Sequence, residues 1–321
     1  MLERRSTKVR PFTIGAAEEV DGAFRRQESR FRHWVTADGS TGFAPEPRRY
    51  HLYVARACPW AHRTIIGRVL MGLEDAISMS FVDPIRDSRG WAFTEVGRYE
   101  DPVNGYRFLA EAYHATDPEF RDRVTVPVLW DRERQTIVNN ESAEIFRMLH
   151  TVFAPLAKRA VELYPSHLTA QIEELNDRIY NRINNGVYKA GFSGRQEVYE
   201  QAVQELFAML DELDMRLKNQ RFLFGPEPLE TDWRLFTTLV RFDAVYQIHF
   251  KCSVRKIAEY PNLWPYLRDL YQWPGIAQTV SFGEIRDHYY RTHGALNPSG
   301  LVAVMPALDF DEPHHRGQIA G

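Results

Sequence analysis

The stretch YHLYVARACPWAHRTIIGRVLMG, residues 50–72, joins a strand pattern to a helix pattern and carries one of only two cysteines in the chain. The alternation over Tyr50–Val54 predicts a strand. Pro59 suits the first turn of a helix, because its missing N–H would have no intrahelical partner there. Apolar residues at helical spacing follow, up to Gly72, which is a typical helix C-cap. Cys58 is therefore expected at the junction, as the N-cap of the helix.

This position favours a reactive Cys58 over a merely packed one. Free N–H groups and the helix dipole stabilise an anion at a helix N-terminus, and the thiolate is the nucleophilic form of cysteine. An inert, buried thiol is the alternative; we assign that structural role to Cys252, which we place in the middle of a later helix. Three residues after Cys58 the chain has Ala61 instead of a resolving cysteine. A disulfide on Cys58 must therefore be resolved by an external thiol, for which glutathione is the obvious cytosolic candidate.

The composition narrows the class of protein. With 321 residues the chain can form two domains, and 44% hydrophobic with 26% charged residues is typical of soluble globular proteins. A net charge of −3 gives no basic footprint for nucleic acid, and no apolar run reaches the ~18–20 residues that span a bilayer. The N-terminus has no signal-peptide pattern. We expect a cytoplasmic protein with no nucleic-acid or membrane partner and no metal.

The order of patterns over residues 49–155 predicts a thioredoxin-like domain. Strands are expected at 50–54, 76–82, 126–130 and 135–138, and helices at 59–71 and at 140–149, with Asn140 as the cap of the second. Residues 83–123 have no clear period and read as a long inserted loop, which inside a compact domain is usually functional. The polar residues 1–48 contain aromatic clusters, so we expect an N-terminal arm docked on the body.

Residues 165–290 show helical patterns only. The expected helices are 168–184, 196–218, 231–250, 262–273 and 276–286, and residues 291–321 are rich in Pro, Gly and His, as a tail wrapped over the surface would be. The fold class is therefore α+β with two domains: a thioredoxin-like domain with a mixed four-stranded sheet, followed by an all-α domain.

Two further motifs suit glutathione. In TVPVL, a cis bond before Pro127 would turn the backbone edge at Val126 toward a peptide. In NNESAEIF, Glu141 and Ser142 fall in the first turn of a helix, where amides and a hydroxyl can hold a carboxylate and Glu141 can meet an α-amino group. Ordinary capping is the alternative. Together with the thiol helix, we interpret these motifs as a glutathione site.

The chain at this point resembles the cytosolic glutathione transferases. More narrowly, CPWAHR, GWAF, RVTVPVLWD, NNESAEIFRML, NNGVYKAGF, RFDAVYQIHFKC and HYYRTH, in this order, are similar to the glutathionyl-hydroquinone reductases, the Xi class of that family. The likeness runs from about residue 31 to residue 300.

The resemblance implies roles for particular residues. Cys58 matches the family's nucleophile, and Tyr188 matches the tyrosine that exchanges a proton with the hydroquinone. Tyr246 and Tyr289 match tyrosines that line the substrate site and influence the thiol, although Tyr290 is adjacent and the motif does not separate the two. The positions matching glutathione-binding residues are Trp91, Arg123, Val124, Thr125, Val126, Glu141 and Ser142.

The expected activity is glutathione-dependent reduction of glutathionyl-hydroquinones, through a Cys58–glutathione mixed disulfide, in a homodimer whose all-α domain binds the hydroquinone. Glutathione is then a co-substrate. An omega-like thiol transferase or dehydroascorbate reductase would use the same thiol, and a non-catalytic binding module of the same fold would need no thiol at the helix start. The sequence does not indicate the physiological hydroquinone.

Overall fold

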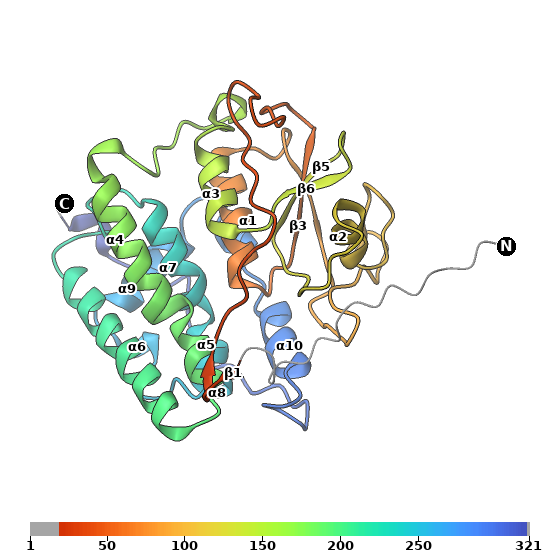
Figure 1. Cartoon of the computed structure of the whole chain (residues 1–321). Coiled ribbons are helices and arrows are strands. Elements are labelled where there is room, and N and C mark those ends of the chain that lie inside the picture. The colour runs from red at the N-terminus through yellow and green to blue at the C-terminus, as the bar shows by residue number, and fades with distance from the viewer. Residues whose placement is uncertain (1–18, 320–321) are drawn as a thin grey trace.

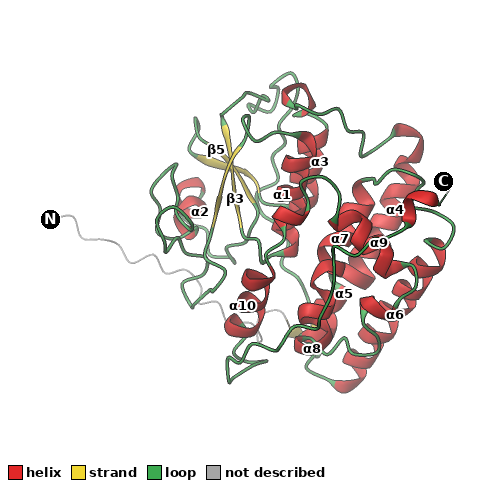
Figure 2. Cartoon of the chain, turned by 180° about the vertical axis from the view of Figure 1, so that it is seen from behind, coloured by secondary structure: helices red, strands yellow, loops and turns green. Residues whose placement is uncertain are grey.

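The computed structural model describes residues 19–319. The first eighteen residues of the expected arm, and the last two of the expected tail, lie outside the described residues. A half built on a β-sheet and a half built of helices lie side by side, as Figure 1 and the reverse view in Figure 2 show.

The sheet has four strands in the order β4-β3-β5-β6. Their bounds are β3 Tyr50–Val54, β4 Ser78–Phe81, β5 Val128–Asp131 and β6 Thr136–Asn139. Strand β3 is parallel to β4 and antiparallel to β5, and β5 is antiparallel to β6. Helices α1 (Pro59–Met71) and α3 (Ser142–His150) lie between the sheet and the helical half, whereas α2 (Ala110–Thr116) lies on the other side (Figure 1). The predicted mixed four-stranded sheet with helices is confirmed.

Two details of the prediction for this half are wrong. Residues 83–123 are not one uninterrupted loop, because α2 forms within them around the buried side chains of Ala112 and Tyr113. Asn140 does not cap α3: Glu141 does, accepting a bond from the Ala143 amide at 3.2 Å. The Asn140 amide oxygen instead accepts a bond from the Phe31 amide.

The helical half is more interrupted than its periodicity suggested. Its α-helices are α4 Thr169–Ile179, α5 Gly186–Gly191, α6 Gln196–Arg216, α7 Glu230–Arg241, α8 Gln247–His249, α9 Leu263–Tyr271 and α10 Phe282–Thr292. Two π-helical segments, η3 Tyr180–Asn184 and η4 Phe242–Tyr246, continue α4 and α7. Short 3₁₀ turns are η1 Ala154–Leu156, η2 Ser166–Leu168, η5 Ile257–Glu259, η6 Ala277–Thr279 and η7 Arg316–Gln318.

Two predictions for this half need correction, and one helix was missed. Helix α5 was not predicted, because NNG reads as a helix end. The expected helix at 276–286 is a 3₁₀ turn followed by α10, which begins after the cap Ser281 and runs to Thr292. Cys252 does not lie within a helix, since α8 ends at His249 and Lys251 adopts a left-handed conformation with φ 57°. Cys252 is completely buried, and burial raises the pKa of its thiol.

The segment before β3 runs along the junction of both halves, as the red trace in Figure 1 shows. It starts with the hairpin of β1 (Glu19–Val20) and β2 (Ala23–Phe24). The amide of Gly194, from the helical half, donates to the Gly22 carbonyl at 3.0 Å. Farther along, the amide of Asn140, next to α3, donates to the Phe31 carbonyl at 2.9 Å. This segment is therefore hydrogen-bonded to both halves.

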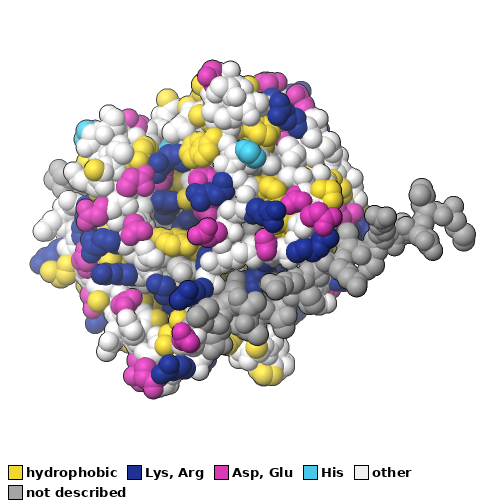
Figure 3. All heavy atoms as spheres, viewed as in Figure 1, with side chains coloured by type: hydrophobic (Ala, Val, Ile, Leu, Met, Phe, Trp, Pro, Cys, Tyr) yellow, Lys and Arg dark blue, Asp and Glu magenta, His cyan; other side chains and the backbone are white. Residues whose placement is uncertain are grey.

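The outer surface shows no preference for one sign of charge on the face drawn in Figure 3, where basic and acidic side chains are interspersed. Within residues 19–319, no helix is long and apolar enough to cross a membrane.

Candidate active site

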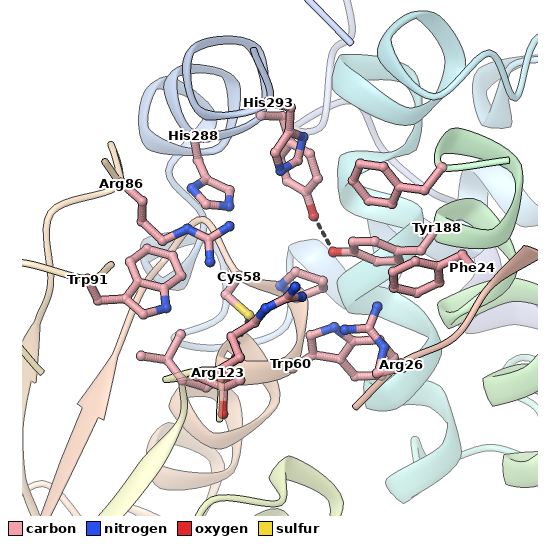
Figure 4. Close-up of a pocket in the computed structure, with 15 residues that line it drawn as sticks. Phe24, Arg26, Cys58, Trp60, Arg86, Trp91, Arg123, Tyr188, His288 and His293 are labelled. Carbon is pink, nitrogen blue, oxygen red and sulfur yellow. Dashed lines mark hydrogen bonds between the residues drawn. The ribbon is translucent and has the colours of Figure 1, made fainter. Parts of the chain in front are cut away.

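A cavity opens at the N-terminus of α1. Its wall comes from both halves and from the segment before β3 (Figure 4). The lining residues are Phe24, Arg26, Cys58, Pro59, Trp60, Arg86, Trp91, Arg123, Thr125, Val126, Tyr188, Phe192, His288, Tyr289 and His293. A second cavity shares Arg26, Trp60, Thr125 and Val126 with the first and is also lined by Pro127, Glu141 and Ser142.

Cys58 is the N-cap residue of α1, with extended backbone angles, and Pro59 occupies the first turn. Its side chain is half-buried in the wall of the first cavity, with Sγ 3.8 Å from the Val126 carbonyl oxygen. The Val126–Pro127 peptide bond is cis, as expected from the sequence. The thiol, the helix N-terminus and the backbone edge at Val126 therefore meet at one place.

Arg241 of α7, in the helical half, is hydrogen-bonded to the backbone just before Cys58. Its Nε donates to the Ala57 carbonyl at 3.1 Å, and its Nη2 donates to the Arg56 carbonyl at 2.6 Å. Its Nη1 lies 3.0 Å from Nδ1 of His62 on α1. Burial and the charge of Arg241 hold the pKa of His62 well below its usual range, so a neutral His62 accepts this bond. The completely buried Arg241 thus holds the two residues that precede Cys58.

Three tyrosine hydroxyls form a hydrogen-bonded chain at the opposite wall. The Tyr188 hydroxyl lies 2.6 Å from that of Tyr289, which lies 2.9 Å from that of Tyr246. Tyr188 and Tyr289 line the cavity, whereas Tyr246 is completely buried behind them. Tyr290 faces away, toward the Ala244 carbonyl. The structure thus brings Tyr289, and not its neighbour, to the cavity.

The tyrosines are kept in the neutral state. Burial raises the pKa of Tyr188, and the negative charge of a Cys58 thiolate would raise it further, while the Arg26 guanidinium and the bond with Tyr289 lower it. Burial also raises the pKa of Tyr246 and of Tyr289 far above the usual range. At neutral pH the cavity therefore presents phenols that can donate protons.

The third wall is formed by Trp91 and α10. The Trp91 ring stacks on the His288 ring with centroids 5.1 Å apart. The Arg86 guanidinium lies 4.5 Å from the centroid of the Trp91 ring. Burial lowers the pKa of Arg86 to about 10, with a further contribution from Arg123. Burial also holds the pKa of His288 well below its usual range, so a neutral His288 donates from Nδ1 to the Pro84 carbonyl at 2.6 Å. This wall is therefore cationic at the arginines and neutral at the imidazole.

The predicted glutathione-binding residues are divided between the two cavities. Thr125 and Val126 line both, Trp91 and Arg123 line only the first, and Glu141 and Ser142 line only the second. Val124 lines neither; it is buried in the hydrophobic core of the sheet half. Besides capping α3, the Glu141 carboxylate accepts a bond from the Ser29 hydroxyl at 2.9 Å. Glu141 therefore both caps α3 and lines the second cavity.

Comparison with known proteins places this architecture in a family. Residues 57–152 match the model of the glutathione S-transferase N-terminal domain, and residues 196–269 match that of the C-terminal domain. The chain is 50% identical over 307 residues to glutathionyl-hydroquinone reductase YqjG of Escherichia coli K12, covering 93% of this chain and 94% of that protein. The chain is a member of the glutathionyl-hydroquinone reductases, the Xi class of glutathione transferases.

Further relatives support the same family assignment. Glutathionyl-hydroquinone reductase PcpF of Sphingobium chlorophenolicum is 44% identical over 287 residues, covering 89% of this chain and 90% of PcpF. A Xi-class transferase of Natrialba magadii superposes with a TM-score of 0.87 at 53% identity, covering 89% and 88% of the two chains. The glutathione-bound structure of YqjG superposes with a TM-score of 0.88, covering 89% and 96%. This transferase therefore shares its fold along nearly its whole length with an enzyme solved with glutathione.

The cavity of this transferase also contains residues that the sequence did not single out: Phe24, Arg26, Trp60, Arg86, Phe192, His288 and His293. Phe24 and Arg26 precede the thioredoxin-like half, and only the aromatic clusters of the arm hinted that this segment reaches the body. His288 and His293 flank Tyr289 in HYYRTH, but neither has spacing that indicates chemistry. These residues are brought together by contacts between distant segments, which local patterns in a single sequence do not predict.

Proposed function

We propose that this chain reduces glutathionyl-hydroquinones to hydroquinones, with glutathione as the reductant. The observation that carries the proposal is that the thiol of Cys58 and the phenol of Tyr188 line the same cavity. The relationship to proteins named glutathionyl-hydroquinone reductases supports the choice of substrate.

The glutathionyl group would lie across the two cavities. Its γ-glutamyl end would meet Glu141 and Ser142 in the second cavity, its backbone would follow the edge at Val126, and its sulfur would reach Cys58 in the first. The hydroquinone ring would then lie against Tyr188. The four residues that line both cavities support this placement, because one extended peptide can contact both cavities at once.

In the first half-reaction the Cys58 thiolate attacks the sulfur that links glutathione to the ring. The S–S bond forms as the C–S bond breaks, and the electron pair of that bond stays on the ring carbon, which takes the proton of Tyr188. The hydroquinone leaves, Cys58 carries glutathione as a mixed disulfide, and Tyr188 is a phenolate.

The second half-reaction restores the enzyme. A second glutathione gives its thiol proton to the Tyr188 phenolate, and its thiolate attacks the glutathionyl sulfur of the mixed disulfide. Oxidised glutathione leaves, and the Cys58 thiolate is released. The thioether sulfur of the substrate and the sulfur of the second glutathione have together supplied the two electrons that the ring carbon received, and the two half-reactions predict ping-pong kinetics.

The nucleophile is tested with Cys58→Ser. We expect no detectable turnover of a glutathionyl-hydroquinone, and no added mass of glutathione when the intact protein is analysed after one equivalent of substrate without free glutathione. The wild-type protein should show the adduct. Intersecting double-reciprocal lines, or a wild-type protein without the adduct, would contradict the mechanism, and the latter would favour a non-catalytic binding module.

The proton donor is tested with Tyr188→Phe. Loss of a general acid should slow hydroquinone release about 100-fold or more, whereas reduction of a glutathione mixed disulfide, which leaves no carbon to protonate, should change less than about 2-fold. Equal losses in both assays would refute the role of Tyr188. A wild-type protein that reduces disulfides or dehydroascorbate far faster than glutathionyl-hydroquinones would instead favour the omega-like function.

We further propose a homodimer in the cytoplasm. Dependence on glutathione as reductant suits a compartment that keeps glutathione reduced. Sedimentation equilibrium at micromolar concentration should give twice the mass of the 37.4 kDa chain; a monomer mass would contradict the assembly.

A further inference from the structure

Arg26 lies in the wall that separates the two cavities, although it precedes the thioredoxin-like half in the sequence. Its guanidinium carbon is 4.6 Å from the ring centroid of Tyr188 and 4.7 Å from that of Trp60. Figure 4 shows the three side chains together on the same side of Cys58. A cation this close to an aromatic face is held by the ring quadrupole, more strongly where water is excluded.

Hydrogen bonds direct the guanidinium. Its Nε donates to the amide oxygen of Asn185 at 2.9 Å. Asn185 is the residue just before α5, the helix that carries Tyr188. The Nη2 of Arg26 is buried and has no hydrogen-bond partner within residues 19–319. One end of the guanidinium is thus tied to the helix of the proton donor, while the other has bonding capacity left.

The chemistry proposed above creates a need for such a cation. When Tyr188 gives up its proton, the negative charge that began on Cys58 resides on a buried phenol ring, and a buried anion is costly unless opposite charge lies nearby. Tyr289 offers one hydrogen bond to that phenolate. The Arg26 guanidinium lies over the ring itself.

We propose that Arg26 is a positioning residue for the proton transfer, stabilising the phenolate form of Tyr188 during hydroquinone release. This proposal rests on the proposed function. It assigns a step of the reaction to the segment before the thioredoxin-like half. No bond to Arg26 forms or breaks; its charge offsets the charge that moves from sulfur to phenol as the C–S bond is cleaved, and that is lost again when the second glutathione reprotonates Tyr188.

The test compares Arg26→Met, Arg26→Lys and the control Arg25→Met, whose exposed side chain lies on the same segment. We expect R26M to slow hydroquinone release about 10- to 30-fold, the range of a partly desolvated cation–π contact, with mixed-disulfide reduction changed less than about 2-fold. R26K keeps a charge and should recover part of the loss. R25M should behave as wild type in both assays.

The pH profile separates an electrostatic role from a structural one. Because the cation lowers the pKa of Tyr188, its removal should move the alkaline limb of hydroquinone release to higher pH, and a protein that is merely loosened would show a lower rate with an unmoved limb. Combining R26M with Tyr188→Phe should add no further loss, because Arg26 acts through Tyr188.

Several results would overturn the proposal: parallel losses in both assays, R26K as slow as R26M, additive losses with Tyr188→Phe, or a change confined to the KM for glutathione. A wild-type protein inactive on glutathionyl-hydroquinones would instead refute the proposed function. The two failures are therefore distinguishable.

Discussion

Tyr188 contacts residues that set the environment of its phenol. Its hydroxyl is bonded to Tyr289, its ring lies 5.3 Å from that of Phe250, and the Arg26 guanidinium lies over it. Burial makes its phenol a weaker acid than a free tyrosine, so in the proposed mechanism each favourable contact with the phenolate would raise the rate of proton transfer. Behind it, Tyr246 extends the hydrogen-bonded chain without reaching the cavity.

Removing the Tyr289 hydroxyl should therefore weaken Tyr188 as an acid. In Tyr289→Phe we expect hydroquinone release to fall about 10-fold, because a phenolate loses a charge-assisted hydrogen bond. The hydrogen bond lowers the pKa of Tyr188, so its loss raises that pKa and shifts the alkaline limb of the rate upward. Tyr290→Phe is the matched control, since Tyr290 does not line the cavity. Equal effects of both variants would contradict this account.

At the scale of the element, two π-helical segments accompany the tyrosines. Segment η3 ends four residues before Tyr188, and η4 ends at Tyr246. A π-helical turn contains more residues than an α-helical one and so changes the direction of the side chains that follow; such turns are frequent at functional sites. Tyr188 follows one of these interruptions and Tyr246 ends the other.

Gly191, the last residue of α5, allows this packing. A Cβ there would lie 2.3 Å from Cγ of Phe250, a buried ring that also packs on Tyr188. Gly191→Ala should lower the free energy of unfolding by about 1–3 kcal/mol through overpacking and should displace Tyr188, lowering activity. Gly283→Ala in α10 is the control, because its Cβ would meet nothing within 4 Å. Denaturant unfolding measures both; an unchanged G191A would show that Phe250 can move freely.

The sequence predicted those elements that have a local signal. The strand before Cys58, the Pro59 helix and its Gly72 cap lie where expected, since alternation, proline and glycine act within a few residues. Helix α5 was missed, because Asn184, Asn185 and Gly186 read as a turn. The π segments have no such signal, and neither do the positions of Arg26, Arg86 and His288 in the cavity wall, which depend on contacts between distant parts of the chain.

Across the whole molecule, Glu230 links the two halves through a buried charge cluster. The first residue of α7, it is completely buried. Its carboxylate accepts bonds from Arg147 of α3 at 2.7 Å, from His150 at 3.1 Å and from Asn176 of α4 at 3.1 Å, and pairs with Arg234 at 3.2 Å. Burial alone would raise the pKa of Glu230, but the bonds from His150 and Arg147 and the charges of Arg234 and Arg147 lower it to about 2.

Glu230→Gln should destabilise the protein in a pH-dependent way. At pH 7 the free energy of unfolding should fall by about 3 kcal/mol, because buried arginine charge loses its partner. A carboxylate with a lowered pKa in the folded state stabilises above its unfolded pKa and loses that effect as pH falls toward the folded value. The difference between wild type and variant should thus be constant above about pH 5 and shrink between about pH 4.5 and 2. Exposed Glu227→Gln is the control; a difference independent of pH would contradict the assignment.

The bonds from Arg241 to the carbonyls of Arg56 and Ala57 give this architecture an evolutionary consequence. Cys58, the proposed nucleophile, belongs to one half, yet the backbone just before it is held by a side chain of the other half, more than 180 positions away in the sequence. A chimera that joins the thioredoxin-like half of one relative to the helical half of another must reproduce this grip to place its thiol correctly. The placement of the thiol therefore depends on the contact between the two halves, and neither half would carry it alone into a chimera.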